Sequence, residues 1–270
     1  MKLTVLVDNN TYIDQYYLGE PAVSYYIEDE GARVLLDTGY SDIFLSNAEK
    51  MGIDLSRLTH IALSHGHNDH TGGLRFLLER YPQLRVELVA HPDCFAPKRD
   101  GAVDIGAPLS AEEAARHLRY HPRRTPYALT ERLLWLGEIP RVNGFEAQHP
   151  IGEQLCGDRW EGDQVRDDTA LVYTGQEGLF IITGCSHSGI CNIMEYAKQV
   201  TGENRVAGII GGFHLLAQNT QLDKTVAALC AAHVERLYPC HCVSLAAKAS
   251  MMRCLPVEEV GVGLRLTIDH

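Results

Sequence analysis

The 270-residue chain lacks the features that would place it in a membrane or in a disulfide-rich secreted class. No apolar run approaches the roughly 20 residues that a membrane-spanning helix needs. The first residues turn acidic too soon for a signal peptide, so we expect a cytoplasmic protein that does not bind membranes. The eight cysteines contain no CxxC pair, which argues against a zinc ribbon. Without a sign of export, we expect them to be reduced.

Several binding signatures are also missing. The sequence has no GxSxG nucleophile elbow, no GxxxxGK[ST] loop and no GxGxxG loop, which argues against a serine hydrolase and a nucleotide-binding fold. The formal net charge of -11 makes nucleic acid a poor partner. We therefore expect a small-molecule substrate. The oligomeric state cannot be predicted from these features.

The chain has enough apolar residues, 45%, for one large core, and no Pro-, Ser- or Gly-rich linker divides it. We expect a single domain over residues 1–270. Apolar patterning predicts strands at 3–7, 22–27, 33–37, 61–64, 86–90, 170–173, 179–183, 206–210, 236–239 and 264–268. It predicts helices at 41–51, 74–81, 110–120, 189–200 and 222–233. Two sheets covered on the outside by helices would bury these faces.

Residues from about 91 to 167 do not follow this alternation and hold much of the proline and arginine. Ser110 with Glu113 three residues later forms a capping box, which predicts the start of the helix over 110–120. The segment is either an insertion or lid that contacts substrate, or an ordinary peripheral subdomain.

The loop from Ser64 to Gly73 holds three imidazoles and a carboxylate within six residues, directly after a predicted strand. His65 and His67 are two residues apart, so in an extended loop they point the same way and can hold one cation. Asp69 shares their direction, and His70 follows on the other side, which suits a second cation. Neutral imidazole and carboxylate are ligands of first-row metals. The alternative is a polar loop that caps the next helix.

A second donor loop follows the strand predicted at 179–183, where Cys185 and His187 are displayed before a helix. Strand ends of this kind carry ligand groups in open α/β sheets. His187 is the candidate that completes the coordination of one metal. Cys185 is either a further ligand or lies just behind it, and the alternative for the pair is a buried thiol beside a helix cap.

Two more histidines follow predicted strands. His214 comes after Gly211 and Gly212, and is a candidate for binding substrate, for general acid catalysis or for metal ligation. We expect His214 to contact the substrate, or to support a metal ligand from outside the coordination shell, rather than to bind metal itself. His241 is the candidate for the last ligand of a second metal. The remaining histidines lack such context and are expected to be structural or exposed; these are His60, His91, His117, His121, His149, His233 and His270.

Two aspartates also fall at strand boundaries. Asp37 ends the strand predicted at 33–37, and we expect it to hold a metal-bound histidine through a hydrogen bond. Asp168 precedes the strand predicted at 170–173, and either ligates a metal or caps a turn.

The loop Ser64–Gly73 resembles the HxHxDH motif of the metallo-β-lactamase-fold hydrolases. With Asp37-Thr38-Gly39, Gly184–Gly189, Gly211–Leu215 and Pro239–Cys242, the chain is similar to the dihydropterin-ribofuranosyl-aminobenzene-phosphate-synthase-like branch. The resemblance covers both ends of the chain and leaves out 91–167.

The resemblance implies an α/β fold, a four-layer αβ/βα sandwich, with a dinuclear site. It implies that His65, His67 and His187 hold one metal, and that Asp69, His70 and His241 hold the other. The expected cofactors are two divalent ions, zinc first, with iron or manganese as alternatives. Many relatives have a bridging aspartate after the later strand, where this sequence has Cys185.

These features predict a metal-dependent hydrolase that uses a metal-activated water, with Asp69 orienting that water and His214 assisting the leaving group. A small phosphate ester or another anionic ester is the preferred substrate class. One alternative is an iron-dependent oxidoreductase of the same fold; flavodiiron-type relatives carry glutamate where His67 stands, so an all-histidine loop favours hydrolysis. The other is a non-catalytic, metal-stabilised binding or sensor domain.

Overall fold

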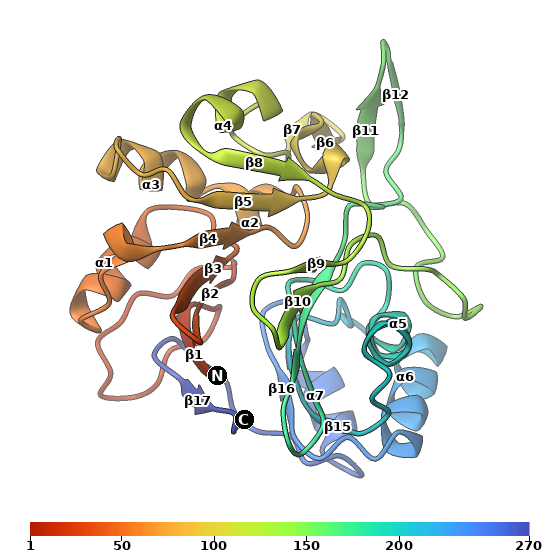
Figure 1. Cartoon of the computed structure of the whole chain (residues 1–270). Helices are drawn as coiled ribbons and strands as arrows, with labels where there is room; N and C mark the ends of the chain where they lie inside the picture. Colours follow the sequence, from red (N-terminus) through yellow and green to blue (C-terminus); the bar gives the residue numbers. More distant parts are fainter. Residues whose placement is uncertain (270) are drawn as a thin grey trace.

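The computed structural model describes residues 1–269 and arranges them as two facing sheets with helices outside (Figure 1). The first sheet has the strand order β17-β1-β2-β3-β4-β5-β8. Its strands are β1 (Lys2–Val7), β2 (Ser24–Asp29), β3 (Ala32–Leu36), β4 (His60–Ala62), β5 (Glu87–Ala90), β8 (Arg119–Pro122) and β17 (Arg265–Thr267).

The second sheet has the order β16-β15-β14-β13-β10-β9. Its strands are β9 (Tyr127–Ala128), β10 (Leu133–Trp135), β13 (Ala170–Thr174), β14 (Leu179–Thr183), β15 (Val206–Gly211) and β16 (Leu237–Pro239). A small third sheet contains β6 (Lys98–Asp100), β7 (Val103–Asp104), β11 (Glu153–Cys156) and β12 (Arg159–Gly162).

Helices cover the outer face of each large sheet (Figure 1). Those on the first half are α1 (Ile43–Lys50), α3 (Leu74–Arg80) and α4 (Ala111–His117), while the short α2 (Asn68–Thr71) lies in the loop after β4. Those on the second half are α5 (Ile190–Thr201), α6 (Thr220–Ala231) and α7 (Leu245–Met251). Two short 3-10 turns lie at Leu55–Arg57 and Pro92–Phe95.

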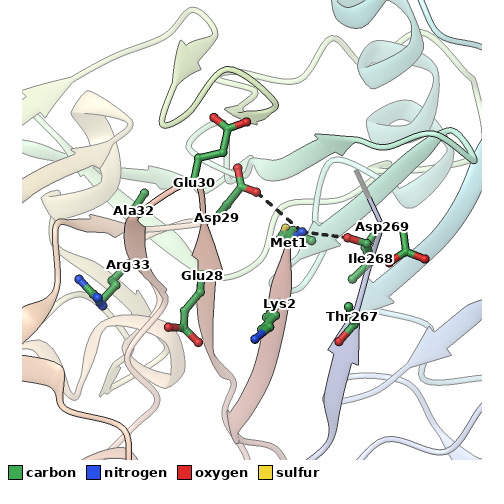
Figure 2. Close-up of a pocket in the computed structure, with 11 residues that line it drawn as sticks. Met1, Lys2, Glu28, Asp29, Glu30, Ala32, Arg33, Thr267, Ile268 and Asp269 are labelled. Carbon is green, nitrogen blue, oxygen red and sulfur yellow. Dashed lines mark hydrogen bonds and ion pairs between the residues drawn. The ribbon is translucent and has the colours of Figure 1, made fainter.

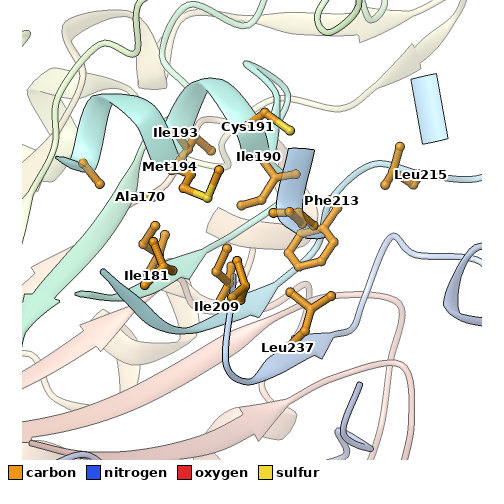
Figure 3. Packing of buried hydrophobic residues seen from close by; sticks show 14 of the residues in the cluster. Ala170, Ile181, Ile190, Cys191, Ile193, Met194, Ile209, Phe213, Leu215 and Leu237 are labelled. Atoms are coloured by element: carbon orange, nitrogen blue, oxygen red, sulfur yellow. The ribbon is translucent and has the colours of Figure 1, made fainter. Parts of the chain in front are cut away.

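Strand alternation explains the layers. Leu35 packs against the outer helices of the first half, whereas its neighbour Leu36 faces the second sheet. In the second sheet, Ile181 packs under α5 while Ile182 joins Leu36 in the core between the sheets. Figure 3 shows α5 lying over Ile181 and the other outward-facing residues of the second sheet. The four-layer αβ/βα sandwich expected from the sequence is confirmed.

The predicted elements of the two halves are present, with bounds that agree to within two residues except at the end of one helix. Ser110 caps α4 through the predicted capping box, but the helix ends at His117 rather than at residue 120. Residues 119–122 instead form β8, which pairs in parallel with β5. The apolar pattern of the sequence does not show where the helix ends and the strand at 119–122 begins.

The segment 91–167 is shared among the three sheets. It supplies β8 to the first sheet, β9 and β10 to the second, and all four strands of the third. Trp135 of β10 is fully buried, and its indole N–H donates to the carbonyl of Leu63 at 3.1 Å. The segment therefore ties the second sheet to the histidine-rich loop.

The strand ends place the donor loops together. β3 and β4 are parallel, and so are β14, β15 and β16, so their carboxyl ends point the same way within each sheet. Backbone hydrogen bonds then join the turns, including Gly212 N–H to the carbonyl of Gly184 at 2.7 Å. One edge of the sandwich thus collects the loops that the sequence singled out.

The other end of β1 holds a cavity of about 280 Å³ (Figure 2). There the amino group of Met1 donates to the carbonyl of Ile268 at 2.8 Å and lies 3.8 Å from Asp29 Oδ1. This cavity lies a full strand away from the donor loops. Among residues 1–269, no helix is long and apolar enough to cross a membrane.

Candidate metal centre

The histidine-rich loop is held in place by its glycine. A Cβ on Gly66 would lie 1.9 Å from the carbonyl oxygen of Cys94, so only glycine fits between His65 and His67. The Gly66 N–H donates to Asp167 Oδ2 at 2.7 Å. Both contacts press the loop against the body of the first half and fix the direction of the two imidazoles.

His65 and His67 converge. Nε2 of His65 lies 3.1 Å from Nδ1 of His67, and Asp69 has a carboxylate oxygen in the same donor group, with all donor atoms within 4.8 Å of one another. Two nitrogens about 2.0 Å from a tetrahedral zinc would be about 3.3 Å apart. The predicted pair therefore has the spacing of two ligands to one cation.

The last two donors of the motif lie on α2 rather than on an extended loop. The helical turn brings Asp69 and His70 next to each other, with Asp69 Oδ2 3.6 Å from His70 Nε2 and 3.3 Å from His241 Nε2. Cys185 completes this group, its Sγ lying 3.2 Å from His70 Nε2. The structure thus gathers the predicted second set and adds Cys185.

His187 lies beside the first set. Its donor group contains His65 and Cys185, and its ring is 4.9 Å from that of His67. Neither ring nitrogen of His187 has a hydrogen-bond partner in the described chain, although both are shielded from solvent. His67 Nε2 is also unpartnered, whereas His241 Nε2 has the contact with Asp69 described above. Buried polar atoms without partners are costly, so these nitrogens indicate a group that the protein binds.

Asp37 supports His70 from behind. Its Oδ2 accepts a hydrogen bond from His70 Nδ1 at 2.7 Å and one from the Ser64 hydroxyl, while Oδ1 accepts from the Ser64 N–H. The predicted hydrogen bond from Asp37 to a histidine of the site is confirmed. It leaves Nε2 of His70 free to face Asp69 and Cys185.

His241 is oriented by two residues that the sequence analysis missed. Its backbone N–H donates to Asp8 Oδ1 at 2.9 Å, and its ring Nδ1 lies 3.0 Å from Asn9 Oδ1. Asp8 and Asn9 directly follow β1, more than 230 positions away in the chain. Their only sequence signal is a polar pair at a strand end, which is too common to identify a site.

The site loops share an unusual backbone conformation. Asp37, Ser186, His214 and His241 all have positive φ, between 48° and 57°, although none is glycine. Each comes one to three residues after a strand end. A positive φ at a residue other than glycine costs free energy, and it occurs mainly where the fold must hold a side chain in one direction, as at functional sites.

The protonation states suit ligation. Burial lowers the pKa of His65 and of His187 well below the ordinary value, and that of His67 to about 4. Burial opposes ionisation of Asp69, but His70 and His241 hold its pKa below the usual range. These three imidazoles are therefore neutral and the carboxylate of Asp69 is ionised, which are the forms that bind cations.

His70 is the exception. Burial would lower its pKa, but the carboxylates of Asp69 and Asp37 outweigh burial and raise it to about 9. The metal-free centre thus keeps an imidazolium between two carboxylates at neutral pH. A cation on Nε2 would take the place of that proton.

A buried lysine anchors the far side of the loop. Lys98 Nζ lies 2.6 Å from Asp163 and 3.2 Å from Asp167, and all three side chains are buried. Asp167 in turn accepts from Gly66. Sequence reasoning missed this connection because the residues come from separate parts of 91–167.

His214 and Asp168 take different places. The ring of His214 is 4.6 Å from that of His187, and the residue lies outside the three donor groups.

Asp168 is buried and accepts from the N–H and hydroxyl of Ser188, so it caps that turn. Of its two predicted roles, the structure supports the turn cap.

The centre opens into a cavity of about 520 Å³. Tyr40 and Leu216 lie on its wall, and 91–167 contributes Ile105 and Ile151. His67, Asp69, His187, His214 and His241 also line it. No lysine or arginine of the described chain is among its lining residues.

Two of the histidines that were expected to be structural or exposed can be placed as follows: His149 is exposed, and His270 lies outside the described residues.

The family model described as "Metallo-beta-lactamase superfamily" matches residues 18–198. The chain is 30% identical over 268 residues to 7,8-dihydropterin-6-methyl-4-(beta-D-ribofuranosyl)-aminobenzene-5'-phosphate synthase from Methanocaldococcus jannaschii, covering 93% of this chain and 90% of that protein. It is 29% identical to the uncharacterised protein MJ0448 of the same organism, over 91% of each chain.

A solved structure is also similar over the whole chain. The crystal structure of Tm1679, described as a metal-dependent hydrolase of the beta-lactamase superfamily, matches with a TM-score of 0.87 and 30% identity, and covers 100% of both chains. The similarity therefore includes the segment 91–167 and the loops that carry His214 and His241.

Proposed function

The chain belongs to the metallo-β-lactamase superfamily, and on that basis we propose that it is a metal-dependent hydrolase acting on a small ester. Members of this superfamily are generally metal-dependent hydrolases. The observation that carries the proposal is the convergence of donor atoms on one side of a cavity. The proposed ligands are His65, His67, Asp69, His70, His187 and His241.

The residues fit a divalent cation. Within each of the three donor groups the ligand atoms lie within 4.8 Å of one another, and the shielded nitrogens of His187 have no partner within residues 1–269. This donor set suits zinc, and it also admits iron or manganese. We propose two ions, one at His65, His67 and His187 and one at Asp69, His70 and His241.

The chemistry that bound divalent ions supply is a lowered pKa of water and polarisation of the ester oxygen. Asp69 lies between the two ligand sets and lines the cavity, so its carboxylate can accept a hydrogen bond from the attacking water and orient it. Burial lowers the pKa of His214, which keeps its ring neutral near pH 7. A neutral imidazole retains one N–H that can donate to the leaving-group oxygen.

The cavity supports an ester of modest size with one anionic end. Its volume of about 520 Å³ falls in the range of small-molecule sites. The apolar wall of Tyr40, Ile105 and Ile151 would contact the body of the substrate. Because no lysine or arginine lines the described cavity, the anionic end would face the metal ligands and His214. A small phosphate ester is the preferred class.

A second candidate follows from the relative whose name denotes a synthase. That relative is 30% identical over nearly the whole chain and is named for a product that carries a 5'-phosphate. We propose synthesis of a phosphate-bearing aminobenzene riboside as the second candidate activity. A phosphorylated substrate would be common to both candidates.

The test uses the chain loaded with zinc and a panel of phosphate monoesters, phosphodiesters and carboxylic esters. We expect turnover of at least one phosphate ester that a chelator abolishes and zinc restores. His67→Ala should lose metal and turnover together, while His149→Ala, at an exposed histidine, should keep both. Full metal content and full turnover in His67→Ala would refute the assignment. If the zinc-loaded chain hydrolyses none of these esters, the result would favour the synthase.

A further inference from the structure

We propose that the thiolate of Cys185 bridges the two cations. The proposal rests on the metal ions of the proposed function and adds a ligand shared by both. It goes beyond the six ligands assigned above, which come from histidine and aspartate alone.

The position of the sulfur is the first argument. Cys185 Sγ belongs to one donor group with His65 and His187, and to another with Asp69, His70 and His241. It therefore lies within ligand distance of donors to both ions. Its Sγ is 3.2 Å from His70 Nε2. Sulfur at about 2.3 Å and nitrogen at about 2.0 Å from one tetrahedral zinc would be about 3.5 Å apart.

Asp69 also reaches donors of both sets, through His65 and His67 on one side and His70 and His241 on the other. It differs from Cys185 in its neighbours, because its group does not include His187. The two side chains therefore approach the space between the ions from different directions. Only a bridge through Cys185 would place sulfur on both ions, and cadmium-113 NMR detects that difference.

The turn around Cys185 is built to hold the sulfur still. A Cβ on Gly184 would lie 2.2 Å from the Ser64 hydroxyl, so the chain passes directly against the histidine-rich loop. Ser186, with φ of 55°, donates its hydroxyl to the carbonyl of Gly212 at 2.7 Å. These contacts fix the residues on both sides of Cys185. The side chain is 4% exposed, so it has little room to turn away.

The chemistry of the group agrees with its position. A thiol bound to a divalent ion loses its proton, because the cation stabilises the thiolate. The S–H bond breaks, the proton passes to solvent, and the freed lone pairs on one sulfur atom form two bonds to the two ions. No oxidant or reductant takes part. A thiolate between the ions would favour zinc, cobalt or cadmium over manganese or magnesium.

Cys242 provides the matched control. It is a second thiol at the same cavity, and its Sγ accepts from the N–H of His214 at 3.2 Å. It lies outside all three donor groups. Cys242→Ser should therefore leave the metal–sulfur bonds in place, whereas Cys185→Ala should remove them.

The first experiment loads the full chain with Co²⁺ and records its near-ultraviolet spectrum. We expect a sulfur-to-cobalt charge-transfer band in the unaltered chain and in Cys242→Ser, and its loss in Cys185→Ala. Should Cys185→Ala fail to fold, as judged by circular dichroism, Cys185→Asp takes its place; it should bind two cobalt ions without the band. A band that persists without Cys185, or its absence from the unaltered chain, would overturn the proposal.

Cadmium-113 NMR of the two-cadmium protein then tests the bridge itself. Both resonances should lie downfield of their positions in Cys185→Asp, because both ions would bind sulfur. A shift of one resonance alone would mean a terminal thiolate and would overturn the bridge. Ester hydrolysis measured on the same samples keeps the two proposals apart: turnover without a sulfur signal refutes the bridge only, and a sulfur signal without turnover refutes the hydrolase only.

Discussion

The carboxylate of Asp37 holds the imidazole of His70, with Oδ2 2.7 Å from Nδ1, at the boundary between the first sheet and the donor loops. The same carboxylate accepts two hydrogen bonds from Ser64, the residue before the first histidine of the motif. One buried side chain therefore fixes both the orientation of the His70 ring and the position of Ser64, where the loop that carries His65 begins.

Asp37→Asn should weaken zinc binding about 10- to 100-fold, the usual effect of losing a partner behind a ligand. The amide cannot accept from His70 and from Ser64 as the carboxylate does, so the ring loses its fixed direction. Chelator competition measures the affinity of each site, and we expect the loss at the site of His70. Asp158→Asn, at an exposed aspartate, is the control. Unchanged affinity in Asp37→Asn would contradict the role.

Gly66→Ala should destabilise the protein and lower its metal content. The added Cβ would lie 1.9 Å from the Cys94 carbonyl, so the loop or the turn after β5 must move. Overpacking of this kind costs about 1 to 3 kcal/mol. Thermal unfolding and metal analysis check both effects. Gly144→Ala, which has open space around the new Cβ, should match the unaltered chain; equal losses in both variants would count against the argument.

His214→Gln should lower kcat about 100-fold or more while leaving the metal content unchanged. The residue lines the cavity beside His187 and lies outside the donor groups, so its loss should affect the substrate rather than the ions. Steady-state kinetics and elemental analysis on one preparation separate the two effects. Loss of a metal ion from the variant would show that His214 is a ligand instead.

Asp168→Asn should become progressively more stable, relative to the unaltered metal-free chain, as the pH rises from 4 to 7. Burial raises the pKa of Asp168 to about 6 from an ordinary value of 3.8. Below pH 3.8 Asp168 is protonated in both the folded and the unfolded chain, so its raised pKa costs no stability. Above about pH 6 it is ionised in both, and its burial then destabilises the folded state by on the order of 2 to 3 kcal/mol. Urea unfolding across this range measures the difference. A difference that stays constant with pH would contradict the assignment.

The sequence predicts the two halves well because their strands and helices are apolar and regularly spaced. β14 and α5 are examples: the strand is wholly buried, and one face of the helix packs on the sheet. The donor loop was also predictable, because its histidines are close in sequence. In contrast, β11 and β12 are short and mostly polar. β11 pairs with β12 and with β6, and neither strand joins the two large sheets.

The missed site residues share a different cause. Asp8 and Asn9 meet His241 only because β1 and β16 end at the same edge of the sandwich. Lys98, Asp163 and Asp167 form one buried cluster although 65 or more positions separate the lysine from either aspartate. Long-range pairing of this kind has no local pattern, so a single sequence cannot reveal it.

Elemental analysis of freshly purified protein, never exposed to chelators, shows whether the donor loops hold metal ions. We expect about two transition-metal ions per chain, with zinc as the expected element, and their removal by chelator should abolish ester hydrolysis until zinc is returned. Iron with visible absorbance would favour the oxidoreductase alternative. A protein that contains no transition metal and takes up none would contradict the assignment of this centre.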